Sequence, residues 1–124
     1  MIKERSKIIE EITEELISMI ADKKVFKLDD RMGIILRDKY EDFITEEDSY
    51  VLMNEIPEHL IAFMRQDNAK NNEVTDFFLK NIQSYFEDGA EQIYFIHHLY
   101  DEPGQISEAL KKANIPESQL EGMF

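Results

Sequence analysis

The three histidines are the residues of this sequence whose spacing could support chemistry. His59 follows Glu55 by four positions, and His97 precedes Asp101 by four positions. Side chains with this spacing share one face of a helix, so either pair could hold a metal ion or simply hydrogen-bond along the helix surface. The sequence assigns no third or fourth ligand, and the Glu-x-x-His motif of di-iron bundles is absent. We therefore treat metal binding as a minor alternative and expect no cofactor.

The usual motifs of a catalytic site are missing. The chain contains no cysteine, which excludes thiolate catalysis, disulfides and cysteine metal sites. No serine lies in a G-x-S-x-G turn, and the glycines at positions 33, 89, 104 and 122 are isolated rather than grouped in a phosphate-binding loop. His97 and His98 would point about 100° apart on a helix, which favours one packed and one exposed side chain. We predict that the protein is not an enzyme.

The net charge is the unusual global property. The chain has 27 acidic and 14 basic residues, which gives a formal net charge of −13 at pH 7. This excess argues against direct binding to nucleic-acid phosphates. Residues 40–60 and 81–110 are two acidic blocks that contain no lysine or arginine. Solubility is the simplest explanation of the charge, and electrostatic steering of a basic partner is the other.

Tyrosines are interleaved with acids in and beside these blocks. Aromatic residues are enriched at the centres of interfaces, and acidic residues surround surfaces that meet basic partners. A tyrosine at the edge of the core, next to solvated acids, is the alternative explanation. The candidate partner-binding residues are Tyr40, Glu41, Asp42, Glu46, Glu47, Asp48, Tyr50, Tyr85, Glu87, Asp88, Glu91, Tyr100, Asp101 and Glu102.

These features favour a small acidic protein-interaction domain that binds and neutralises a basic protein. The partner would be a toxin or a nucleic-acid-binding protein, and this chain would act as an immunity protein, an antitoxin or an inhibitor that mimics nucleic-acid charge. A general adaptor or regulatory helical protein is the alternative. A metal-binding or enzymatic protein that uses Glu55/His59 and His97/Asp101 is a more distant one. No segment has the apolar length of a membrane span or the pattern of an export signal, so we expect a cytoplasmic protein without membrane contacts.

The length fits a single domain of residues 1–124, and apolar residues recur with helical period along most of it. A first helix is expected over residues 6–21, and Asp29 or Asp30 can cap a second one that ends near Phe43. Thr45 and Asp48 have the spacing of a capping box for a third helix, which runs to Pro57 and is followed by further helix to about residue 65. A short helix is expected over residues 105–112, with a last turn at 117–120. We predict an all-α bundle of about five to six helices.

Gly33 is expected inside the second helix at an energetic cost, and Pro57 is expected to interrupt the third. Glycine costs about 1 kcal/mol in a helix interior relative to alanine, and a tight helix crossing is the usual reason to find one there. Proline lacks the backbone N–H, so Pro57 predicts a break or a sharp kink. A loop is expected over residues 66–72.

Residues 71–104 are expected to form the centre of the bundle as a helical hairpin around Gly89. Asn72 is a suitable cap for its first helix, and Gly89 suits the left-handed residue that closes a helix. Ala90–Tyr100 is rich in residues that favour strands, but its apolar residues recur with helical period, so we predict a helix. The expected core residues of the hairpin are Phe77, Phe78, Ile82, Phe86, Ile93 and Ile96. Its outer side carries Tyr85 and acids for which the sequence shows no countercharge.

Overall fold

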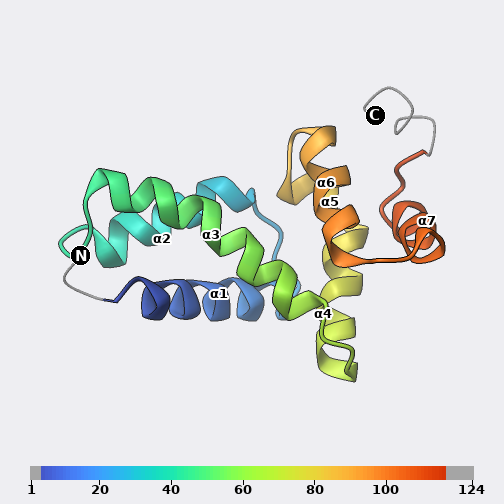
Figure 1. Ribbon diagram of the computed structural model, residues 1–124, viewed down its shortest axis with the longest axis horizontal. Coiled ribbons are helices and arrows are strands. Elements are labelled where there is room, and N and C mark those ends of the chain that lie inside the picture. Colours follow the sequence, from blue (N-terminus) through green and yellow to red (C-terminus); the bar gives the residue numbers. More distant parts are fainter. Residues whose placement is uncertain (1–3, 117–124) are drawn as a thin grey trace.

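The computed structural model describes residues 4–116, and these form only helices and their connections, as predicted (Figure 1). In chain order, the helices of this range are α1 (Arg5–Ala21), α2 (Leu28–Tyr40), α3 (Glu46–Met64), α4 (Ala69–Lys80), α5 (Ile82–Tyr85), α6 (Gly89–Leu99) and α7 (Pro103–Lys112). The last turn expected at residues 117–120 lies outside the described residues.

Helices α1 and α3 are the centre of the arrangement. Figure 1 shows α1, α2 and α3 running roughly along the long axis of the molecule, with α4 crossing near the end of α3 and α7 furthest from the N-terminus. Helix α1 packs against α3 and α4, while α3 also contacts α2, α4 and α6. Ile12 and Leu16 of α1 and Leu52 and Ile56 of α3 are fully buried. The apolar stripe of α1 therefore packs against the core, as the sequence predicts.

The capping box of the third helix is confirmed. The Thr45 backbone N–H donates to Asp48 Oδ2 at 2.9 Å, and the Asp48 N–H donates to Thr45 Oγ1 at 3.1 Å. The backbone hydrogen bond from Thr45 holds the pKa of the Asp48 carboxyl below its usual value. The start of α3 is thus determined by local residues.

Two other helix starts differ from the sequence prediction. Helix α2 begins at Leu28, so Asp29 and Asp30 lie in its first turn rather than at the capping position. Helix α4 begins at Ala69 because Asn68 caps it by accepting a hydrogen bond from the Asn71 N–H at 3.0 Å. Asn72, the expected cap, therefore lies inside α4. For α4, amide side chains close together offered more than one possible start, whereas α2 begins after Lys27 without a side-chain cap.

The predictions for Gly33 and Pro57 are also corrected. Helix α3 continues from Glu46 to Met64 with Pro57 inside it, so the predicted break does not occur, while the alternative of a kink stays a prediction. A Cβ atom placed on Gly33 would meet nothing within 4 Å, so no tight helix crossing requires this glycine. Helix α2 ends at Tyr40, and Phe43 beyond it is exposed rather than part of a helical stripe.

The central hairpin has a different construction from the one predicted. Gly89 begins α6 instead of closing the preceding helix, and no described glycine has a positive φ. The Asp88 side chain caps α6 by accepting from the Ala90 N–H at 2.9 Å. The preceding segment is divided at Asn81, which has a φ of −120° and separates α4 from the single turn of α5. The helix predicted over Ala90–Tyr100 is confirmed as α6.

Most of the predicted hairpin core is buried, and Phe77 is the exception. Phe78 is buried, whereas Phe77 is only partly buried, with the Lys23 ammonium 5.0 Å from its ring centre. Tyr85 was expected on the outer side, but it is 1% exposed and stacks on Phe78 with ring centroids 4.5 Å apart. Its hydroxyl donates to the Lys24 carbonyl at 2.7 Å, which satisfies the buried polar group. Burial raises the pKa of Tyr85 to about 12.

Candidate functional site

The best candidate for a functional site is a groove of about 980 Å³ between α3 and α6. This volume lies at the upper end of the range of ligand pockets, and the groove is open to solvent along its length. Helix α3 contributes Tyr50, Met53, Asn54, Pro57, Glu58 and Ile61. The segment around α6 contributes Phe86, Ala90, Glu91, Tyr94, Phe95 and His98, and Asp29 from the first turn of α2 completes the lining.

Helix α3 positions one side of the groove because it has two apolar faces. The lining residues from Tyr50 to Ile61 follow the spacing i, i+3, i+4, i+7, i+8 and i+11, which is a single helical face. Leu52, Ile56 and Leu60 form the other face, and they are fully buried in the core. The groove face is therefore a second face of α3, whose Met53 and Ile61 pack against the edge of the core and stay partly exposed.

The surface of the groove is mainly apolar and aromatic. Phe86 and Phe95 are buried beneath it with ring centroids 5.3 Å apart, and Met53, Pro57 and Ile61 of α3 are partly exposed. Tyr50 and Tyr94 are the two most exposed large hydrophobic residues of the described chain, at 78% and 61%. Contiguous exposed apolar surface of this kind marks interaction sites in soluble proteins, and tyrosines are common binding anchors.

The rim of the groove carries negative charge only. Asp29, Glu58 and Glu91 line it, and no lysine or arginine is among its described lining residues. Partial burial raises the pKa of the Glu91 carboxyl, and the negative charges of Asp29 and Asp88 raise it further. The ionised form of Glu91 is thus disfavoured while the groove is empty, and a cation placed there would favour it.

His98 lies at the end of this groove and is held by its own helix. Its Nδ1 is 2.8 Å from the Tyr94 carbonyl oxygen, and its ring lies 4.0 Å from the Tyr94 ring, centroid to centroid. The contact fixes the orientation of both rings on the exposed side of α6. The structure thus gives one of the two adjacent histidines a place in the groove, although not in a catalytic arrangement.

Of the candidate residues predicted from the sequence, the structure brings two into the groove. Tyr50 lies on the α3 side and Glu91 on the α6 side. Glu41, Asp42, Glu46, Glu47 and Glu102 are exposed elsewhere and do not line it.

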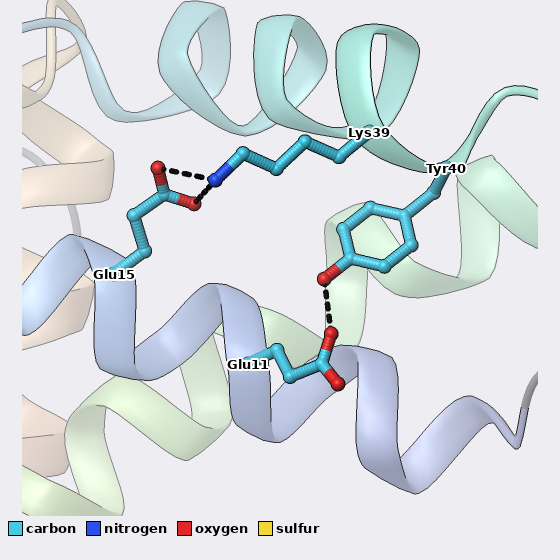
Figure 2. A network of polar contacts seen from close by, with 4 residues as sticks. All are labelled: Glu11, Glu15, Lys39 and Tyr40. Carbon is cyan, nitrogen blue, oxygen red and sulfur yellow. Dashed lines mark hydrogen bonds and ion pairs between the residues drawn. The ribbon is translucent and has the colours of Figure 1, made fainter.

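Two predicted tyrosines are buried, which removes them from the outer surface. Tyr40 is 5% exposed, and its hydroxyl donates to a Glu11 carboxylate oxygen on α1 (Figure 2). Burial, followed by the hydrogen bond to Glu11, raises the pKa of Tyr40. Beside this contact, the Lys39 ammonium donates to both carboxylate oxygens of Glu15 at 3.0 Å. Tyr40 therefore links α2 to α1, just as Tyr85 belongs to the core.

The second acidic block has countercharges that the local sequence does not show. Lys27 forms an ion pair with Glu87, and Arg65 forms one with Asp101 at 2.8 Å. Asp48 and Asp88 act as helix-capping residues. The expectation that the outer side of the hairpin lacks countercharge is therefore wrong for Glu87 and Asp101, because the fold supplies bases from distant positions.

A second pocket of about 420 Å³ lies where α3, α4, α6 and α7 meet, and Tyr100 is part of its lining. Its charged groups are already paired with one another. Arg65 donates to the His98 carbonyl at 2.9 Å as well as to Asp101, and Lys112 lies 2.9 Å from Asp76. These contacts attach α7 and α6 to the neighbouring helices, so we assign them a structural role.

The histidine–carboxylate pairs do not form a ligand cluster. Glu55 forms an ion pair with Arg5 at 3.5 Å, and Asp101 pairs with Arg65. Within residues 4–116, no group of three or more histidine, aspartate and glutamate side chains could hold a metal ion.

Most groove residues were missed from the sequence, and one signal could have indicated those on α3. The apolar positions of residues 50–61 fit two helical stripes rather than one, and the second stripe ends in Pro57, Glu58 and Ile61. A second stripe on a helix predicts a second contact surface. The α6 side could not be found this way, because Phe86, Tyr94 and Phe95 come together only when α5 and α6 pack.

Comparisons with protein-family models, curated proteins and solved structures found no significant match to this chain. Among the described helices, none combines the length and the apolar character needed to cross a membrane.

Proposed function

We propose that the protein is an interaction domain that binds a basic partner protein through the α3–α6 groove. The observation that carries the proposal is the combination in one groove of an apolar floor, two exposed tyrosines and a rim with three carboxylates and no cation among its described lining residues. Charge complementarity therefore selects a positively charged partner, and the apolar floor selects one that also has an apolar face.

An amphipathic basic helix is the partner segment that fits this groove. The α3 lining extends from Tyr50 to Ile61, which corresponds to about 16 Å, or about three turns of a docked helix. An apolar stripe on that helix would contact Met53, Ile61 and the rings beneath them. Lysines and arginines beside the stripe would reach the carboxylates of the rim.

The net charge of −13 supports the same partner class over longer distances. A strongly acidic molecule attracts basic proteins and accelerates their association, and this effect weakens as salt screens the charges. Neutralisation of a toxin with a cationic active site, as by an immunity protein or antitoxin, is the specific form of this proposal. This form of the proposal requires that the toxin segment bound in the groove lies in the toxin's active site, or that its binding blocks access to that site.

A direct test uses synthetic peptides of about five helical turns. The first has leucines at helical spacing with arginines and lysines beside them, the second has the same composition in scrambled order, and the third has glutamates in place of the bases. We expect only the first to bind with chemical-shift changes centred on the groove. Its affinity should fall at least about tenfold between about 50 mM and 500 mM NaCl. Equal binding of the scrambled peptide would contradict recognition by a groove.

Matched variants locate the binding surface. Tyr94→Ala should weaken binding of the amphipathic peptide by about 30-fold, which is the usual loss at an aromatic anchor. Phe43→Ala is the control, since Phe43 is also an exposed aromatic but does not line the groove. Equal losses in the two variants would place the binding surface elsewhere.

A further inference from the structure

Pro57 gives the groove a feature that an ordinary helix face lacks. In an α-helix, the carbonyl of residue i accepts the N–H of residue i+4. Helix α3 runs unbroken from Glu46 to Met64, so the Met53 carbonyl should receive the N–H of residue 57. Proline has no N–H. The Met53 carbonyl therefore lacks its usual helical donor, although the helix continues on both sides.

This carbonyl lies on the groove side of α3. A helical carbonyl points along the axis toward the residue four positions later, and Met53 and Pro57 both line the groove. The nearby side-chain amide of Asn54 is directed to a different carbonyl, since its Nδ2 donates to the Tyr50 carbonyl at 3.1 Å. The next lining residue is Glu58, whose carboxylate is a second acceptor close to the same turn.

We infer that the partner places an arginine over the Pro57 turn, where its guanidinium donates to both the Met53 carbonyl and the Glu58 carboxylate. This inference rests on the proposed function of the groove. Arginine fits because its planar guanidinium has five N–H groups in a fixed fork and can serve two acceptors at once. Lysine presents a single compact ammonium group and is less suited to two separated acceptors. The proline is then a specificity device, since it leaves a backbone acceptor available in a continuous helix.

The test is a double-mutant cycle between Pro57→Ala in the protein and arginine-to-norleucine in the bound peptide. Alanine restores the N–H that occupies the Met53 carbonyl, and norleucine keeps the aliphatic stem without donors. For the native protein, we expect the norleucine peptide to bind about tenfold more weakly than the arginine peptide. For Pro57→Ala, this ratio should fall to about threefold, because only the contact with Glu58 remains. Loss of the proline ring affects both peptides and cancels in the ratio.

Two further measurements complete the design. Glu58→Gln should also reduce the arginine preference, and Val51→Ala, on the same helix but outside the groove lining, should leave it at tenfold. Urea unfolding should show Pro57→Ala to be folded and at least as stable as the native protein, because a helical hydrogen bond is gained.

The outcomes separate this inference from the proposed function. If both peptides bind in the groove with equal affinity, the arginine is not recognised and the inference is overturned, while the groove function stands. If the tenfold preference persists in Pro57→Ala, the Met53 carbonyl is not the acceptor. If no amphipathic basic peptide binds, the proposed function fails and this inference fails with it.

Discussion

At the scale of single residues, Glu91 shows how a charged residue of the groove can oppose stability. Its carboxylate is partly buried, it lies near Asp29 and Asp88, and its pKa is raised above the usual value. The helix dipole favours a negative charge in the first turn of α6, where Glu91 lies, but burial and repulsion outweigh this effect. Ionisation of Glu91 is therefore less favourable in the folded state than in the unfolded chain. A basic partner would oppose this effect.

We predict that Glu91→Gln stabilises the free protein at neutral pH. Below the unfolded-state pKa of about 4.3, Glu91 is protonated in both states and does not affect stability. As the pH rises through the raised folded-state pKa, Glu91 increasingly destabilises the folded protein. Glutamine cannot ionise, so the gain should be a few tenths of a kcal/mol at about pH 7 and vanish near pH 3.5. Urea unfolding at both pH values measures the difference.

Glu10→Gln is the matched control, since Glu10 is exposed on α1 and its side chain forms no salt bridge or hydrogen bond with another residue of the range 4–116. It should change the free energy of unfolding little at either pH. A loss of stability in Glu91→Gln at neutral pH would show that the helix dipole outweighs burial and repulsion. The same variant should weaken binding of the basic amphipathic peptide, because the partner loses a carboxylate.

At the scale of elements, Gly33 is a weak point of α2 with no structural justification. It lies in the helix interior, its φ is not positive, and a Cβ atom would meet nothing within 4 Å. Gly33→Ala should therefore raise the free energy of unfolding by about 0.5–1 kcal/mol, because alanine loses less backbone entropy on folding. Thermal and urea unfolding both measure this change.

Gly104→Ala is a useful comparison, because Gly104 also has free space for a Cβ but lies in the first turn of α7. Its gain should be smaller than that of Gly33→Ala, since the end of a helix is less strongly held than its interior. A loss of stability in Gly33→Ala would contradict the prediction, because it would show that α2 does not accept a methyl group where the structure has free space.

At the scale of the whole molecule, the excess of negative charge should make folding and binding respond to salt in opposite directions. Self-repulsion at a net charge of −13 disfavours the compact state, and the ion pairs of the described residues are mostly exposed. We predict that raising NaCl from about 10 mM to 300 mM increases the free energy of unfolding while it weakens peptide binding.

Urea is the denaturant for this measurement, because guanidinium is itself a salt and would screen the charges. A decrease in stability with salt would show that the ion pairs contribute more than the net repulsion removes. Binding that strengthens with salt would contradict electrostatic recognition and would point to a purely apolar contact.

The sequence by itself determined the features that depend on local residues. The helical class follows from apolar periodicity, and the start of α3 follows from Thr45 and Asp48, which satisfy each other's backbone groups across one turn. The C-terminal end of α7 was also predictable. Asn114, two positions after the last residue of α7, has a φ of 58°, the left-handed conformation that asparagine tolerates. Such signals need no knowledge of the rest of the chain.

Only the tertiary structure decided which of several similar residues face outward and where charges are paired. Tyr50 and Tyr85 both lie beside acids in the sequence, but the fold exposes one at 78% and buries the other against Phe78. Lys27 and Glu87 are 60 positions apart and become an ion pair only when α5 packs near the start of α2. The groove likewise needs α6 to lie beside the second face of α3. Local periodicity alone does not show which helix face packs inside and which stays exposed. Long-range packing decides this, and in this protein it forms the α3–α6 groove.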